Sequence, residues 1–261
     1  MIIVSICTIP GRINSLIEVL KSIENQSLMP DKILITISEY YPRSKKYYKI
    51  PDIEKLIEFI KDYKIETHIN KLILDIGPSL KILSPLSYFN LNQDDFIVTF
   101  DDDSIPYSKS IEILHTSYRK NPESIYGLMG VRENKFIHTE MLPKDYDYYV
   151  VDTLGGYRGI IYPKSLIEDD FVEWVYKIIN IHNQEDLVAM HDDQIFSYYF
   201  KYKGIQRRVA KFISDGSDEM KYYPIENKDG IFNDPETLKS LEIINKYLSI
   251  SGLDWILSNP Y

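Results

Sequence analysis

The chain has 261 residues, of which 44% are apolar and 26% are charged, an ordinary composition for a globular protein with a sizeable core. Its formal net charge of −9 argues against broad nucleic-acid binding, because that requires a basic surface that displaces counterions from phosphates. Cys7 is the single cysteine, so an internal disulfide is excluded.

Strands and helices are predicted to alternate over the first half of the chain. Residues 2–8 form a short apolar run rich in β-branched side chains, which Pro10-Gly11 stops, so they predict a buried strand. Residues 13–23 place isoleucine and leucine on one stripe of a helix. The same reasoning predicts, in order, a strand at 32–38, a helix at 53–63, a strand at 66–73, a helix at 78–88, a strand at 96–100 and a helix at 108–119.

The second half of the chain is less regular. The sequence predicts strands at 125–131, 136–137, 149–154 and 158–161, a helix at 194–202, and an amphipathic helical tail at 235–248. No repeat, low-complexity segment or linker is visible. We therefore expect one domain over residues 1–220 and a helical C-terminal extension, 221–261, packed on it.

The alternation of strands and helices indicates an α/β architecture, with a Rossmann-like, mixed but mainly parallel sheet flanked by helices. In open sheets of this kind, ligands bind beyond the carboxyl ends of the strands. The turn at residues 8–12 and the acidic triplet Asp101-Asp102-Asp103 each follow a predicted strand. We therefore expect the turn and the triplet to border one crevice.

The acidic triplet is a candidate metal site. Three adjacent carboxylates repel one another, and a divalent cation removes that conflict because hard ions bind carboxylate oxygens. Side chains alternate along an extended chain, so Asp101 and Asp103 are expected on one face and Asp102 on the other. This pattern favours Mn²⁺ or Mg²⁺ held by Asp101 and Asp103. The alternative is a solvated acidic turn that caps the following helix.

Several motifs follow one another in an order that resembles a known family. Thr-Ile-Pro-x-Arg stands at 8–12, Asp-x-Gly-Pro-x-x-Lys at 75–81, the acidic triplet at 101–103, Gly-Gly at 155–156 and Asp-Asp-x-x-x-Ser at 192–197. The series resembles the GT-A glycosyltransferases, particularly the bacterial and large-virus members related to glycosyltransferase family two. It covers residues 2–204 and implies the GT-A fold of nucleotide-diphospho-sugar transferases.

The resemblance implies a donor side. Asp103 matches the direct metal ligand, and Asp101 matches the position that reaches the ribose or the water shell of the metal. Lys81 would contact the diphosphate, a role that suits a point cation, although it could instead be an ordinary surface lysine. The residues expected to contact the donor are Thr8, Pro10, Arg12, Asp75, Lys81, Asp101 and Asp102.

The resemblance also implies an acceptor side and a catalytic base. Gly155 and Gly156 match a glycine-rich loop near the acceptor, although the pair also fits a plain hairpin turn. Asp192 and Asp193 match the acidic pair that supplies the base in inverting members, and either one could be that base. One of the two could instead cap the following helix, but a cap needs only one carboxylate. Many relatives place a metal-binding histidine late in the chain, whereas no histidine follows His191 here.

The expected function is therefore a metal-dependent, inverting sugar transfer from a UDP- or GDP-sugar to a hydroxyl of a glycan or glycoconjugate. Two alternatives stay open. A sugar-phosphate nucleotidyltransferase would usually carry a Gly-rich, Arg-containing loop after its first strand. Residues 8–12 do not have that motif. A non-catalytic nucleotide-sugar or glycan-binding module would need no base.

The expected location follows from what the sequence lacks. The N-terminus has no basic leader, and no apolar run reaches the roughly 18 residues that a membrane-spanning helix needs. We therefore expect no membrane span and no nucleic-acid partner. The expected location is the cytoplasm, which would be the host cytoplasm if a virus encodes the chain.

Overall fold

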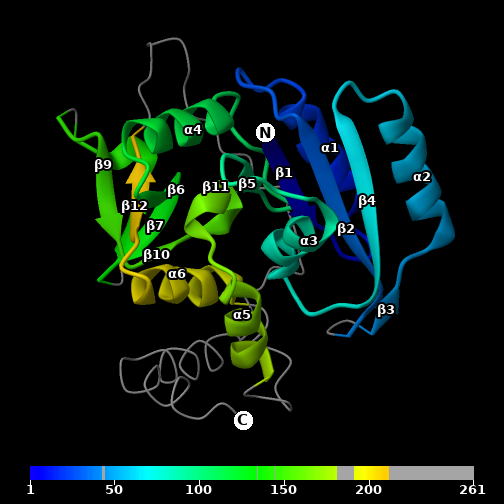
Figure 1. The fold of residues 1–261 in the computed structure, drawn as a ribbon. Helices are drawn as coiled ribbons and strands as arrows, with labels where there is room; N and C mark the ends of the chain where they lie inside the picture. Colours follow the sequence, from blue (N-terminus) through cyan, green and yellow to red (C-terminus); the bar gives the residue numbers. More distant parts are fainter. Residues whose placement is uncertain (43–44, 134, 144, 181–190, 212–261) are drawn as a thin grey trace.

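Helices and strands alternate in the computed structural model, which describes residues 1–261 apart from 43–44, 134, 144, 181–190 and 212–261 (Figure 1). The helices are α1 (Ile13–Ile23), α2 (Ile50–Lys61), α3 (Leu80–Tyr88), α4 (Ser110–Lys120), α5 (Phe171–Asn180) and α6 (Asp192–Tyr202). The strands are β1 (Ile2–Cys7), β2 (Lys32–Tyr41), β3 (Lys46–Tyr47), β4 (Glu66–Leu74), β5 (Phe96–Thr99), β6 (Ser124–Gly127), β7 (Met129–Arg132), β8 (Lys135–His138), β9 (Tyr148–Val151), β10 (Thr153–Leu154), β11 (Ile160–Pro163) and β12 (Gln206–Ala210).

A nine-stranded mixed sheet forms the centre of the fold, in the order β3-β2-β1-β5-β11-β6-β12-β9, with β4 also paired to β2. Strands β4, β2, β1 and β5 run parallel to one another, and β11 runs antiparallel between β5 and β6. Three further strands form a separate small antiparallel sheet in the order β10-β7-β8, and its strand β7 follows β6 directly in the chain. The predicted α/β class with a mixed sheet is confirmed, whereas the predicted strand at 125–131 is divided between the two sheets at Leu128.

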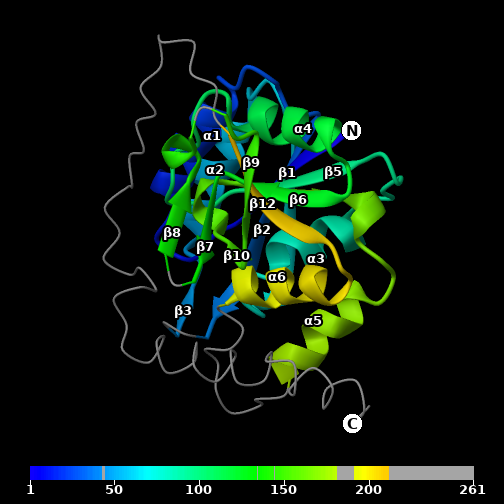
Figure 2. The same ribbon diagram turned by 90° about the vertical axis from the view of Figure 1, so that its left-hand side faces the viewer.

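Helices cover both faces of the large sheet. Helices α1, α2 and α4 contribute side chains to one buried apolar cluster, and α3, α5 and α6 contribute to a second. Figure 2 shows α4 on one side of the strands and α3, α5 and α6 on the other. Strands β1 and β5 are therefore covered on both faces, which explains why their sequences are almost continuously apolar.

Some elements differ from the expectation. Helix α5 was not predicted, although Phe171, Trp174, Val175 and Ile178 are buried at helical spacing. Strand β12 was also not predicted, because its two arginines obscure an apolar pattern. The expected extension at 221–261, with its helix at 235–248, lies outside the described residues. Among the helices that the structure describes, none combines the length and apolarity needed to cross a membrane.

The carboxyl ends of the parallel strands gather several polar residues at one edge. Strand β1 ends at Cys7, β4 at Leu74 and β5 at Thr99, so the loops that carry Thr8, Asp75 and the acidic triplet begin there. Parallel strands β1 and β2 pair Cys7 with Thr36. The fold thus brings segments from residues 8, 36, 75 and 101 together.

Candidate functional site

A cleft of about 100 Å³ opens beyond the carboxyl ends of β1 and β4 and along the second half of β2. Pro10 does not line it but lies in the adjoining turn, where the Arg12 N–H donates to the Ile9 carbonyl oxygen at 3.1 Å. The other residues predicted to contact a donor all line the cleft: Thr8, Arg12, Asp75, Lys81, Asp101 and Asp102.

Strand β2 adds lining residues that the sequence reasoning missed. Thr36 and Ser38 alternate with isoleucines, so both project from one face of the strand into the cleft. The backbone N–H of Thr8 donates to the carbonyl oxygen of Thr36 at 3.1 Å, which joins the end of β1 to the middle of β2. Small polar side chains between the isoleucines of this strand were the available signal.

Asp75 shapes the rim of the cleft. Its Oδ1 accepts the backbone N–H of Gly77 at 2.6 Å. Gly77 has a φ of +87°, a conformation that favours glycine, so the residue fits this turn. Burial raises the pKa of the Asp75 carboxyl.

Two cations of the chain itself pair with the acidic triplet. Arg12 Nη1 donates to Asp102 Oδ1 at 2.9 Å and lies 3.1 Å from Asp103 Oδ2. Lys81 Nζ lies 2.5 Å from Asp101 Oδ1. These two cations offset part of the repulsion within the triplet, and a metal bound there stays a prediction.

The alternation expected within the triplet is wrong. Strand β5 ends at Thr99, and residues 102–103 form a turn. The side chains of Asp102 and Asp103 consequently reach the same guanidinium group instead of pointing to opposite faces. Extended-chain geometry does not apply beyond the end of the strand.

Asp102 is the most deeply buried carboxylate of the triplet, with a side chain 5% exposed. Burial raises its pKa to about 6, although Arg12 opposes the shift. A hydrogen bond from the Thr8 hydroxyl also opposes the shift, so Thr8 and Asp102 contact each other in the cleft.

Lys81 links the cleft to helix α6. Its side chain is 10% exposed, and its Nζ lies 3.4 Å from Asp192 Oδ2 in addition to its contact with Asp101. Burial alone would lower the pKa of this lysine, but the two carboxylates raise it well above its usual value. Lys81 is therefore a buried ammonium group, and the interpretation as an ordinary surface lysine is wrong.

The acidic pair forms the first turn of α6 instead of capping it. His191 is the N-cap residue, and no side-chain capping hydrogen bond is present there. Asp192 is 8% exposed, whereas Asp193 is partly exposed. The backbone N–H of Gly156 donates to both carboxylate oxygens of Asp193, at 3.1 and 3.0 Å. The helix-cap interpretation of the pair is wrong.

The two carboxylates of the pair differ in what surrounds them. Burial raises the pKa of both, and the neighbouring Asp192 raises that of Asp193 further. Asp192 is paired with Lys81, whereas Asp193 is held by a neutral amide. A partly accessible carboxylate with a raised pKa is suited to accept a proton.

The Gly155-Gly156 pair is not a hairpin turn. Strand β10, which precedes it, pairs with β7, whereas β11, which follows it, pairs with β5 and β6. A short 3₁₀ helix, Gly156–Arg158, lies between them. The pair therefore belongs to a loop that faces α6.

Asp101 and Asp103 are the more accessible carboxylates of the triplet. Their side chains are 28% and 21% exposed, so their oxygens are accessible. Within the described ranges, no group of three or more His, Cys, Asp or Glu side chains is placed to hold a metal. Mg²⁺ usually binds through one or two carboxylates plus substrate phosphates, which is compatible with this pair.

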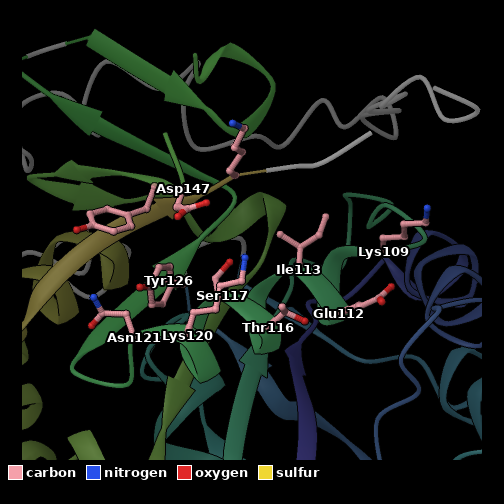
Figure 3. A pocket seen from close by; sticks show the side chains of 11 residues that line it. Lys109, Glu112, Ile113, Thr116, Ser117, Lys120, Asn121, Tyr126 and Asp147 are labelled. Atoms are coloured by element: carbon pink, nitrogen blue, oxygen red, sulfur yellow. The ribbon is translucent and has the colours of Figure 1, made fainter. Parts of the chain in front are cut away.

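A larger cavity, about 410 Å³, lies beside helix α4 (Figure 3). Lys109, Glu112, Tyr126 and Asp147 are among its lining residues, and none of the predicted site residues belongs to it. The smaller cleft is the better candidate site, because it gathers paired buried charges at the carboxyl edge of the parallel strands.

Comparisons with known proteins establish the fold. No protein-family model and no curated protein sequence matches the chain. The structure of S. aureus TarS residues 1–349 with UDP-GlcNAc matches with a TM-score of 0.58 at 14% identity, covering 93% of this chain and 65% of that one. The corresponding UDP complex gives 0.53 at 14% identity, covering 93% and 64%. A longer TarS structure gives 0.53 at 13% identity, covering 98% of this chain and 42% of that one. The chain thus spans less than two thirds of these proteins, and it has the GT-A fold of these glycosyltransferases.

Proposed function

We propose that the chain transfers a sugar from a nucleotide-diphosphate donor to an acceptor hydroxyl. This proposal rests on the contacts between buried cations and carboxylates at the edge of the sheet. Arg12 and Lys81 contact the acidic triplet there, and Lys81 connects the triplet to the pair that contains Asp193. UDP and UDP-GlcNAc, which TarS binds in its crystal structures, belong to the donor class we propose, a UDP- or GDP-sugar.

The cleft supplies the donor side. Thr8 and Asp75 line the part next to β1 and β4, where they would contact the nucleoside. Lys81 would contribute positive charge toward the diphosphate. Asp101 and Asp103 would hold Mn²⁺ or Mg²⁺, which when bound neutralises charge on a leaving diphosphate.

Asp193 supplies the acceptor side with a base. An acceptor hydroxyl oxygen of a glycan or glycoconjugate would form a bond to the anomeric carbon as the bond from that carbon to the diphosphate breaks. The hydroxyl proton passes to Asp193, and the nucleoside diphosphate leaves. A single displacement of this kind inverts the anomeric centre. Asp192 is the weaker candidate because it is buried and paired with Lys81.

A donor screen tests the proposal. Nucleoside diphosphates and UDP- and GDP-sugars are added with and without Mn²⁺, and the melting temperature is measured, because a ligand that binds the folded chain raises its apparent stability. The best donor is then incubated with the chain, with water as acceptor, and free nucleoside diphosphate is quantified. We expect an Asp193→Asn variant to bind that donor but to release little diphosphate.

Other outcomes would identify the alternatives. Release of pyrophosphate from a nucleoside triphosphate and a sugar phosphate would indicate a nucleotidyltransferase. Donor binding without any diphosphate release, from water or from glycan acceptors, would indicate a binding module. Either result would overturn the proposed transfer.

A further inference from the structure

Two backbone N–H groups attach the segment around the end of β10 to helix α6. The backbone N–H of Leu154 donates to Ser197 Oγ at 3.1 Å. Two residues later, the N–H of Gly156 donates to both oxygens of Asp193. Ser197 and Asp193 lie one helical turn apart, so the loop follows one face of the helix.

The other side of the same loop is fixed to the sheets. The N–H of Gly155 donates to the Met129 carbonyl oxygen at 3.0 Å. Gly159 has a φ of +106°, and a Cβ placed on it would lie 2.4 Å from Cε1 of Phe100. Phe100 directly precedes the acidic triplet. The Gly156 amide is therefore held in place by contacts on both sides.

The approach of this amide to Asp193 requires glycine. A Cβ added at position 156 would lie 2.9 Å from Asp193 Oδ1, closer than real Cβ atoms come to another heavy atom. The atom that it would meet is the carboxylate oxygen itself. Alanine at this position would displace the carboxylate from the amide.

We propose that the backbone N–H of Gly156 positions the carboxylate of Asp193 for proton transfer from the acceptor. This inference rests on the proposed function. Hydrogen bonds to a charged acceptor are shorter and stronger than neutral ones, so the contact favours the ionised form that a base needs. Gly156 is thus a positioning residue, and Asp193 is the group that receives the proton.

A double-mutant cycle separates positioning from general stabilisation. Gly156→Ala, Asp193→Asn and the double variant are compared for diphosphate release from the best donor of the screen, with water as acceptor. Gly155→Ala provides a matched neighbour, because its Cβ would meet the flexible thioether of Met129 and not the carboxylate. Donor affinity is measured for each variant by calorimetry.

We expect Gly156→Ala to lower kcat by about tenfold or more, as loss of a placed base does, with donor affinity nearly unchanged. In the Asp193→Asn background the same alanine should cause no further loss, because sites that act through one another are not additive. Gly155→Ala should lower kcat by the same factor in both backgrounds.

Ser197→Ala offers a second route if Gly156→Ala does not fold. It removes the acceptor of the Leu154 N–H and loosens the loop without touching Asp193. Its loss of kcat should likewise vanish in the Asp193→Asn background. Additive losses for both variants, or no loss with Gly156→Ala, would overturn the positioning role while leaving sugar transfer intact. A wild-type chain that releases no diphosphate from any donor would overturn the proposed function itself.

Discussion

A Lys81→Met variant removes the ammonium group between Asp101 and Asp192 while keeping an unbranched side chain of similar reach. The side chains of Lys81 and Asp192 are only 10% and 11% exposed, so Asp192 would be left buried without its cation. Breaking a buried pair in this way costs about 3–5 kcal/mol. Asp101 adds less to this cost because it is more exposed.

Protonation of Asp192 sets an upper limit to that cost. Neutralising a carboxyl group with an ordinary pKa of ~3.9 costs about 4 kcal/mol at pH 7, at about 1.4 kcal/mol per pH unit. We therefore expect the free energy of unfolding to fall by about 3–4 kcal/mol at pH 7. At pH 5 the same protonation costs about 1.5 kcal/mol, so the deficit should shrink to that value or less.

The sign of the pH effect follows from the folded and unfolded pKa values of Asp192. Burial raises the folded-state pKa, and removing Lys81 takes away the charge that lowers it. The folded variant then binds more protons than the unfolded chain above the unfolded pKa of ~3.9, so its stability falls as the pH rises.

Urea unfolding at pH 7 and pH 5, followed by circular dichroism, measures both effects. Lys21→Met is the matched control: Lys21 pairs with Glu18 on the surface, with both side chains about half exposed, so its loss should cost less than about 1 kcal/mol. Adding Asp192→Asn to Lys81→Met should restore much of the stability. Equal effects at positions 81 and 21, or a deficit independent of pH, would refute the reasoning.

Three further predictions concern the site and its support. Asp103→Asn should weaken the activation of diphosphate release by Mn²⁺ about tenfold or more, while the melting temperature stays near that of the wild type, because an amide is a poorer ligand for a hard cation. Diphosphate release should decline on acidification at a pH well above ~3.9, because burial and Asp192 raise the pKa of Asp193 and only its ionised form accepts a proton. Gly159→Ala should destabilise the chain by about 2–4 kcal/mol in thermal unfolding, since it adds a collision with Phe100 to the cost of a positive φ.

Each of these has a result that contradicts it. Unchanged Mn²⁺ activation in Asp103→Asn would remove that residue from the metal site. If diphosphate release declined only near pH 4, Asp193 would not be the titrating base. Gly204 also has a positive φ, +72°, but open space around its Cβ position. Equal destabilisation by Gly204→Ala and Gly159→Ala would show that the Phe100 contact is unimportant.

Local patterns predicted the first half of the fold well. The helix predicted at 13–23 matches α1 at both ends, because its apolar stripe is long and uninterrupted. The predicted strand ends at residues 8, 73 and 100 each lie within one residue of the end of β1, β4 or β5. Parallel strands alternating with helices leave few possible arrangements, so placing the site at the carboxyl edge followed directly.

The second half was harder because its strands pair over long sequence distances. Strand β12 lies parallel to β6 and antiparallel to β9, and its Arg207 and Arg208 are nearly buried despite their charge. The Arg208 guanidinium lies 3.8 Å from the centre of the Tyr148 ring and donates to the hydroxyl of Tyr126. The contacts that make burial of these arginines possible come from residues distant in the sequence. A local sequence pattern could therefore not have revealed this strand.

The acidic triplet shows why a sequence can locate a site and still misjudge its electrostatics. Like charges side by side do require a counter-charge, but Arg12 and Lys81 supply it from 90 and 20 residues away. These two cations offset part of the negative charge of the three carboxylates. The metal that we propose would neutralise charge on the diphosphate of the donor. Arg12 and Lys81 cannot fully neutralise that charge while they pair with the triplet. Metal and donor should consequently bind together, each strengthening the binding of the other.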